Sequence, residues 1–337
     1  TVRPAVDILF SQYHLSVLFA PEHGIRGDQQ AGAAVAAARD SRTGLPVFSL
    51  YGDRKAPAPE QLADIDTLVV DLQDVGSRYY TYLSTLAIVM KSCAEAGLPV
   101  VVLDRPNPLG GDRVEGPVLD PEFRSFVGCS AMPARYGLTI GEFACRINSE
   151  EHIGCRLAVS RLTGWRRSMY FEQTGLPWVS PSPNIPTVDS AVAYAGTCLF
   201  EGTNLSEGRG TTKPFELIGA PWLNAEYVLR HIDQTALEGV VLRPCWFRPS
   251  FSKFAGELCA GLQLHCLDRR LFCPYAASAA LLEAVRAGHP EFRFLDPPAA
   301  NDHFMIDLLS GSDDLRLRRG RLRASLDGRE GEEDPER

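Results

Sequence analysis

The sequence predicts an α/β protein with a Rossmann-like, mostly parallel sheet domain followed by a smaller α+β domain. Two observations carry this prediction: strand and helix patterns alternate over residues 1–150, and the strands there are apolar throughout. Strands that are apolar on both faces are usually buried between helices in a parallel sheet. A length of 337 residues also exceeds what one compact core normally holds, so we expect two domains.

The first domain, residues 1–150, is expected to alternate strands and helices. A helix is predicted over 80–96, because apolar residues recur there at helical spacing and Gly97 follows. A second helix is predicted from the N-cap Thr139 to Asn148, since Glu142 completes a capping box. Four strands are expected in this domain, at residues 16–20, 46–50, 67–72 and 98–103.

Residues 151–315 are expected to form the smaller α+β domain, which completes a cleft with the first. A strand over 155–162 leads into a stiff Pro-rich loop at 178–186. The tail 316–337 is highly charged, and we expect it to be disordered. The other expected elements are helices over 224–235 and 275–287 and strands near 240–247 and 260–267.

Charge and composition narrow the function classes. A net charge of -8 argues against nucleic acid or an anionic membrane as partner. No segment reaches the roughly 18 apolar residues of a membrane span, and the first residues show no signal-peptide pattern. The nine cysteines include no C-x-x-C pair, so we expect buried free thiols and no metal site. A small molecule is the expected partner, and the oligomeric state stays open.

Acidic residues follow three of the predicted strands. The three segments are Leu18–Gly24, Leu68–Asp74 and Val100–Asn107, and each ends in polar or charged side chains. In an open α/β sheet, ligands bind at the carboxyl ends of the strands. We therefore expect the three segments to contribute to one site.

A Gly-rich loop over residues 201–213 predicts recognition of an anion. Its glycines allow the backbone to approach a ligand closely. Arg209, Thr211 and Thr212 supply donors that suit a carboxylate. A phosphate site and a structural turn between the domains are the alternatives.

Long, irregular motifs resemble one protein family from about residue 17 to residue 310. Among them are FAPEHGIRGDQQAG, TGLPVFSLYG, DLQDVGSRYYTYLSTL, TGLPWVSPSPNIPT and GTCLFEGTNLSEGRGTTKPFELIGAPW. They are similar to exo-acting β-N-acetylmuramidases, bacterial glycoside hydrolases that trim N-acetylmuramic acid from peptidoglycan fragments. One departure is Arg135-Tyr136-Gly137, where a histidine is common at the central position. The resemblance implies glycosidase activity, no cofactor, and a secreted or cell-envelope location.

Glu22, the acid of the Pro-Glu-His-Gly motif, is the candidate general acid. The resemblance implies this role, and its position agrees, because an acid at a strand end is placed to protonate a leaving oxygen. The alternatives are a pair with Arg26 or a cap on the following helix. Asp74 is the candidate for the second catalytic carboxylate. A substrate-assisted route through the N-acetyl group stays open, as do three other acids: Glu115, Glu201 and Glu207. Asp71 lies near Asp74, and its structural alternative is a buried residue that holds backbone amides of the loop.

Muramic acid carries a lactyl ether with a carboxylate, which we expect the Gly-rich loop to select. Structural alternatives exist for several residues, such as a brace between Asp104 and Arg105 or a pair between Asp74 and Arg78. The candidate substrate-binding residues are His23, Arg26, Asp71, Gln73, Arg78, Tyr79, Asp104, Arg105, Asn107, Asn184, Glu201, Asn204, Glu207, Arg209, Thr211 and Thr212.

Two other functions compete with the glycosidase. One is a non-catalytic binding protein for anionic cell-wall sugars, which would keep the Gly-rich loop and have no need of Glu22. The other is a nucleotide- or phosphosugar-dependent enzyme. The lack of G-x-G-x-x-G after an early strand weighs against this second alternative.

Overall fold

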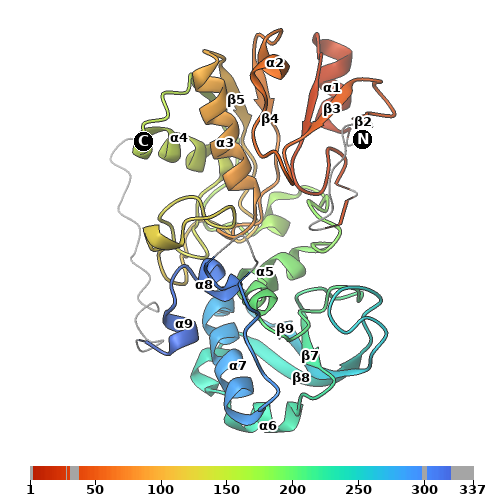
Figure 1. The fold of residues 1–337 in the computed structure, drawn as a ribbon, viewed down its shortest axis with the longest axis vertical. Helices are drawn as coiled ribbons and strands as arrows, with labels where there is room; N and C mark the ends of the chain where they lie inside the picture. Colours follow the sequence, from red (N-terminus) through yellow and green to blue (C-terminus); the bar gives the residue numbers. More distant parts are fainter. Residues whose placement is uncertain (1–2, 28, 31–37, 298–301, 320–337) are drawn as a thin grey trace.

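The computed structural model describes residues 3–27, 29–30, 38–297 and 302–319 (Figure 1). It is a mixed α/β structure, in agreement with the predicted class. The sequence predicts disorder for residues 316–337. Of these, residues 320–337 lie outside the described residues.

The parallel strands of the first part are divided between two small sheets. In one sheet, β3 pairs in parallel with β1 and antiparallel with β2. In the other sheet, β5 pairs in parallel with β4 on one side and with β6 on the other. The strands are β1 (Leu18–Ala20), β2 (Ala38–Arg39), β3 (Pro46–Ser49), β4 (Leu68–Val70), β5 (Val100–Leu103) and β6 (Leu157–Ser160).

Strand β6 joins the first part of the chain, although the sequence analysis assigned its residues to the second domain. It lies in register with β5, from Leu157 opposite Val100 to Ser160 opposite Leu103. Its residues alternate between half-buried and exposed, as is common for an edge strand. This alternation sets it apart from the apolar strands that identify the sheet in the sequence.

The predicted helices cover the second sheet. Helix α3 (Tyr82–Glu95) ends before Gly97, and α4 (Ile140–Glu150) begins at the expected capping box. The Glu142 carboxylate accepts the backbone N–H of Thr139 at 2.9 Å, and the Thr139 hydroxyl accepts that of Glu142 at 3.2 Å. Two short helices precede them, α1 (Ala5–Gln12) and α2 (Pro59–Leu62). One buried cluster links helices and sheet through Leu83, Leu86, Met90, Val100, Val102 and Phe143.

The second part is an antiparallel sheet with helices packed on one face. Strand β9 is central and pairs with β7 and β8, as Figure 1 shows in the lower half of the molecule. Apolar side chains of this sheet share a large core with the helices. The elements are α5 (Val188–Thr197), β7 (Leu217–Ala220), α6 (Ala225–His231), β8 (Val240–Phe247), β9 (Cys259–Cys266), α7 (Pro274–Gly288), α8 (Met305–Ser310) and α9 (Asp314–Leu317).

Tyrosines at the start of α3 connect the two parts. Tyr79, Tyr80 and Tyr82 are buried in the core that α5 and α7 form. The Tyr79 hydroxyl donates to the carbonyl oxygen of Ala195 in α5. The start of α3 therefore lies near α5, which occupies the middle of the molecule in Figure 1. Within the described ranges, no helix is long and apolar enough to cross a membrane.

Candidate active site

Glu22 lies directly after β1, and hydroxyl groups from two other segments hold its side chain. It is 8% exposed. Its Oε2 accepts the Thr81 hydroxyl at 2.7 Å, just before α3. Burial, the charge of Glu22 and a hydrogen bond with Glu22 raise the pKa of Tyr51, which follows β3. Three segments thus meet at one carboxyl, and the Thr81 hydroxyl holds its Oε2.

His23 presents a neutral ring beside this carboxyl. Its backbone φ is 73°, a left-handed conformation that costs energy for a residue with a side chain and is often found at functional sites. Burial lowers the pKa of His23. Its Nδ1 lies 3.1 Å from the carbonyl oxygen of Gln29, which can only accept, so Nδ1 carries the proton. Nε2 is then an acceptor suited to a sugar hydroxyl.

Arg209 brings the Gly-rich loop to the same site from the second part of the chain. Its charge lowers the pKa of both His23 and Tyr51, whereas the charge of Glu22 raises the pKa of both. Two opposite charges that act on the same two side chains lie at one site. Glu22 and Arg209 therefore both lie close enough to His23 and Tyr51 to shift their pKa values.

The Arg209 guanidinium is balanced by two acids. Its Nη2 donates to Glu201 Oε1 at 2.5 Å, and its Nε lies 3.2 Å from Glu207 Oε1. Burial lowers the pKa of Arg209, but these two carboxylates more than offset that effect and raise it. Glu207 also accepts Lys253 at 3.0 Å. Glu201 and Glu207 thus hold the cation in place, and 16% of the Arg209 side chain stays exposed.

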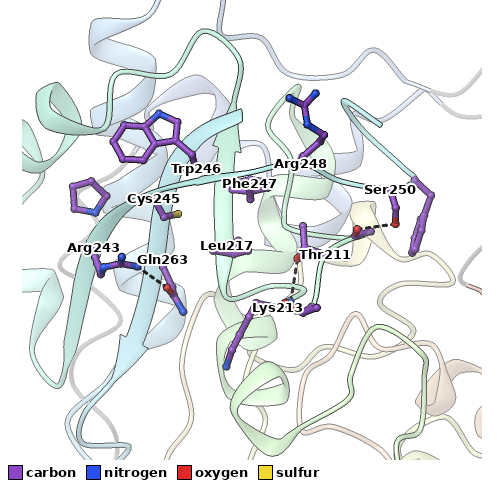
Figure 2. A pocket seen from close by; sticks show the side chains of 14 residues that line it. Thr211, Lys213, Leu217, Arg243, Cys245, Trp246, Phe247, Arg248, Ser250 and Gln263 are labelled. Carbon is purple, nitrogen blue, oxygen red and sulfur yellow. Dashed lines mark hydrogen bonds between the residues drawn. The ribbon is translucent and has the colours of Figure 1, made fainter. Parts of the chain in front are cut away.

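The rest of the Gly-rich loop turns away from this cluster. Gly210 has a φ of +80°, and a Cβ there would lie 2.5 Å from the Phe251 carbonyl oxygen, so only glycine fits the turn. Thr211 and Thr212 line a groove on the second sheet, which does not include Arg209 (Figure 2). The Thr211 hydroxyl donates to the Gly208 carbonyl oxygen at 2.6 Å. The Gly-rich loop therefore contributes to two separate places: Arg209 acts on His23 and Tyr51, and Thr211 and Thr212 line the groove.

Asp74 is buried behind the tyrosines. It is 5% exposed, and its Oδ2 accepts the backbone N–H of Gly76 at 2.7 Å and the Tyr136 hydroxyl. Tyr136 is the residue that departs from the family motif. Besides burial, the charges of Asp74 and Glu22 both raise the pKa of Tyr80 and Tyr82, so both carboxyls lie near this pair. Burial raises the pKa of Asp74 to about 7.

We expect Asp74 to make the protein less stable as pH rises from about 4 to about 7. In that range the unfolded carboxyl ionises and the folded one keeps its proton, so unfolding releases a proton. A shift from 3.8 to about 7 corresponds to at most about 4 kcal/mol. Asp74→Asn should flatten this slope in urea unfolding, whereas Asp64→Asn, at an exposed position, should not. An unchanged slope in Asp74→Asn would contradict the assignment.

Two candidate residues at the strand ends pair with each other. Asp71 and Arg105 form a bidentate ion pair with distances of 2.5 and 2.8 Å. Asp104 instead accepts the backbone N–H of Gly141 at 2.7 Å and the Thr139 hydroxyl at 3.0 Å, and so anchors the start of α4. The internal brace that the sequence suggests therefore joins Arg105 to Asp71, not to Asp104.

Other candidates make contacts within the fold. The Asn184 amide donates to Gln30 Oε1 at 3.0 Å and ties the Pro-rich loop to the loop after β1. A Cβ at Gly76 would lie 2.4 Å from Asn107 Oδ1, so this turn packs tightly. The remaining contacts join Arg26 to Asp7 and Asp40, Gln73 to Asp74 and Pro106, Arg78 to Pro117, Met132 and Leu309, Asn107 to Leu138 and Leu109, Glu115 to Arg135, and Asn204 to Glu291 and Arg293.

Sequence reasoning missed Tyr51 and Thr81. Tyr51 is the second-last residue of the motif TGLPVFSLYG and comes just after β3, as Glu22 comes just after β1. Because β1 and β3 are parallel neighbours, their carboxyl ends meet at one edge. That rule, applied to the 46–50 strand, would have found Tyr51. Thr81 carried no comparable signal, because the sequence places it inside the predicted 80–96 helix, whereas the helix in the structure begins at Tyr82.

A fixed carboxyl at a strand end, faced by a balanced cation and a neutral histidine, suits a glycoside hydrolase acting on an anionic sugar. Two family models match the chain. Residues 1–189 match the N-terminal domain of exo-beta-N-acetylmuramidase NamZ, and residues 192–325 match its C-terminal domain. The chain belongs to this family of glycosidases.

Relatives support this membership. Peptidoglycan beta-N-acetylmuramidase NamZ of Bacillus subtilis (strain 168) is 48% identical over 298 residues, which are 88% of this chain and 72% of that protein. Two crystal structures of DUF1343 family proteins from Bacteroides fragilis NCTC 9343 are also similar. One has a TM-score of 0.82 and 38% identity and covers 93% of this chain and 81% of its own. The other has a TM-score of 0.72 and 30% identity, with 93% and 80% covered.

Proposed function

We propose that this protein hydrolyses peptidoglycan fragments and releases terminal N-acetylmuramic acid, with Glu22 as the general acid. The enclosure of the Glu22 carboxyl by Thr81 and Tyr51 is the observation that supports this role most directly. Glycoside hydrolysis needs an acid positioned to protonate the leaving oxygen. A carboxyl held by two hydroxyls cannot rotate freely, so its proton can be aimed at one atom.

Arg209 supports the choice of sugar. Its guanidinium is partly exposed at the site, and it is the cation that the lactyl carboxylate of muramic acid would meet. Glu201 and Glu207 hold the guanidinium through ion pairs. In this proposal Nε2 of His23 accepts a sugar hydroxyl, since Nδ1 carries the ring proton toward the Gln29 carbonyl oxygen. Glucosamine lacks the lactyl group and would leave this cation without an anionic partner.

Asp74 remains our candidate for the second acid. A pKa of about 7 leaves it partly ionised at neutral pH, which suits a base. Because Asp74 is buried, we propose that it acts on the substrate indirectly, through Tyr80 and Tyr82, whose pKa values its charge raises. In the alternative mechanism, the N-acetyl group of the substrate takes the place of a second catalytic carboxylate as nucleophile. We also propose that the two sheets with parallel pairs represent the Rossmann-like half, supported by the pairing of β1 with β3 and of β4 with β5 and β6.

The direct test compares two chromogenic substrates. We expect nitrophenol release from nitrophenyl β-N-acetylmuramide and little from the matching glucosaminide, together with free N-acetylmuramic acid from digested peptidoglycan by mass spectrometry. A binding protein for cell-wall sugars would instead bind the muramide saturably and release nothing. That result would refute the enzymatic proposal.

A further inference from the structure

The loop between β8 and β9 packs against the Gly-rich loop. This 249–256 loop closes on itself through a backbone hydrogen bond of 2.8 Å between its two end residues. Ser250 donates to the Gly210 carbonyl oxygen twice, through its backbone N–H and through its hydroxyl, each time at 2.8 Å (Figure 2). A Cβ at Gly210 would lie 2.5 Å from the Phe251 carbonyl oxygen, so the two loops are in close contact.

Two residues with strained backbone flank Lys253 in the 249–256 loop. Ser252 has a φ of 69°, and Phe254 has a φ of 56°. This left-handed conformation costs energy for a residue other than glycine, and it persists only where surrounding contacts hold it in place. The contacts that Lys253 makes across the two loops are suited to hold it.

The Lys253 ammonium is surrounded by oxygen acceptors from residues 200–207. It donates to the carbonyl oxygens of Phe200 and Leu205, each at 2.9 Å, and to that of Glu201 at 3.3 Å. The fourth acceptor is Glu207 Oε2, at 3.0 Å. An ammonium has three N–H donors, so these four oxygens use its full capacity. Lys253 is therefore committed to contacts within the protein.

Glu207 connects Lys253 to Arg209. Each oxygen of its carboxylate contacts one cation, since Oε2 lies 3.0 Å from Lys253 Nζ and Oε1 lies 3.2 Å from Arg209 Nε. The Glu207 side chain is only 2% exposed, so water has little access to replace either cation. Lys253 also holds the backbone of Glu201, whose side chain accepts Arg209 Nη2 at 2.5 Å. One ammonium thus contacts both acids that pair with Arg209.

We infer that Lys253 is a positioning residue for recognition of the anionic sugar. It holds Glu207 and the backbone of Glu201, and these two acids keep the Arg209 guanidinium in the orientation that meets the lactyl carboxylate. The inference rests on the proposed function, because Lys253 acts on the sugar only through Arg209. A planar guanidinium binds a carboxylate best when its fork has a fixed direction. Without Lys253, Glu207 loses the cation on its second oxygen, and its pair with Arg209 can shift away from the sugar.

The test compares Lys253→Met with Lys91→Met, which changes an exposed lysine of α3. We expect Lys253→Met to lower kcat/KM for nitrophenyl β-N-acetylmuramide about tenfold, as for a binding group displaced by a fraction of an ångström. The loss should lie mainly in KM, because the lactyl carboxylate is bound before the reaction as well as during it. In calorimetry, the preference for N-acetylmuramic acid over N-acetylglucosamine should fall by a similar factor. Lys91→Met should change neither quantity.

Lys253→Arg keeps a cation for Glu207 and carries the test if Lys253→Met does not fold. Its planar fork cannot direct one compact ammonium at three carbonyl oxygens. Its preference for N-acetylmuramic acid should therefore be lower than that of the unaltered protein and higher than that of a folded Lys253→Met.

A purely structural role of Lys253 would weaken the binding of both sugars equally. That result, or an unaltered preference in a folded Lys253→Met, would overturn the inference and leave the proposed hydrolysis intact. If Lys253→Met does not fold, an unaltered preference in Lys253→Arg overturns it.

Failure of the proposed function looks different, because the unaltered protein would then release no nitrophenol. Calorimetry decides that case: binding of N-acetylmuramic acid that Lys253→Met weakens supports the inference, and unchanged binding refutes it. An unaltered protein that does not bind N-acetylmuramic acid refutes the inference together with the proposed function.

Discussion

Glu22→Gln is expected to lose nearly all hydrolysis of peptidoglycan fragments and still bind them. Glutamine has the size of glutamate and can accept the Thr81 hydroxyl that Glu22 accepts at 2.7 Å, but it cannot deliver a proton. Loss of a general acid lowers kcat by roughly 100- to 10,000-fold. Fragment binding, measured by calorimetry, should change little, because the shape and contacts of the site stay the same.

The leaving group provides the sharpest control for this prediction. Nitrophenolate leaves without protonation, so Glu22→Gln should lose much less activity on nitrophenyl β-N-acetylmuramide than on a glycan. A loss of equal size on both substrates would contradict a role as proton donor. Thr81→Val should lower kcat with little change in KM, and Thr81→Ser, which restores the hydroxyl, should recover it; a merely structural role would not follow the hydroxyl in this way.

Arg209→Gln is expected to lower kcat/KM for the muramide by about 30-fold or more. Truncating one partner of a buried charge pair costs about 2–5 kcal/mol. Arg209 pairs with two acids of the protein and, in the proposed function, also binds the lactyl carboxylate. The variant should also lose selectivity between N-acetylmuramic acid and N-acetylglucosamine in calorimetry. Arg209→Lys keeps the charge without the planar guanidinium, so its kcat/KM should lie between that of the unaltered protein and that of Arg209→Gln.

A loss of folding must be separated from a loss of recognition in Arg209→Gln. Lys253 still pairs with Glu207 at 3.0 Å, so the buried Glu207 keeps one cation. Glu201→Gln provides the matched control, because it disturbs the same ion-pair network and leaves the cation for the substrate. Arg209→Gln that is folded by circular dichroism and still prefers the muramide would refute the assignment.

Several local features were predictable from the sequence because they depend on nearby residues. The capping box of Thr139 and Glu142 satisfies backbone N–H groups within one turn and appears as predicted. Strand β8 occupies the predicted residues 240–247, since apolar patterning and the flanking residues define it locally. Helix α5 was missed: nearly all of its residues are buried, many of them small, so it has no amphipathic pattern, and the preceding prolines suggest a loop.

The sequence by itself determined the family, the α/β class and the place of Glu22 at the end of a strand, because motifs and apolar patterns are properties of the chain order. Only the tertiary structure decided which side chains surround that acid. Thr81 and Tyr51 reach it from two distant segments, and the charge of Arg209 acts on its neighbours His23 and Tyr51. Asp71, Asp104 and Arg105 make contacts within the fold. Polar side chains at a strand end have several partners of similar energy within reach, and packing between segments far apart in the sequence selects among them.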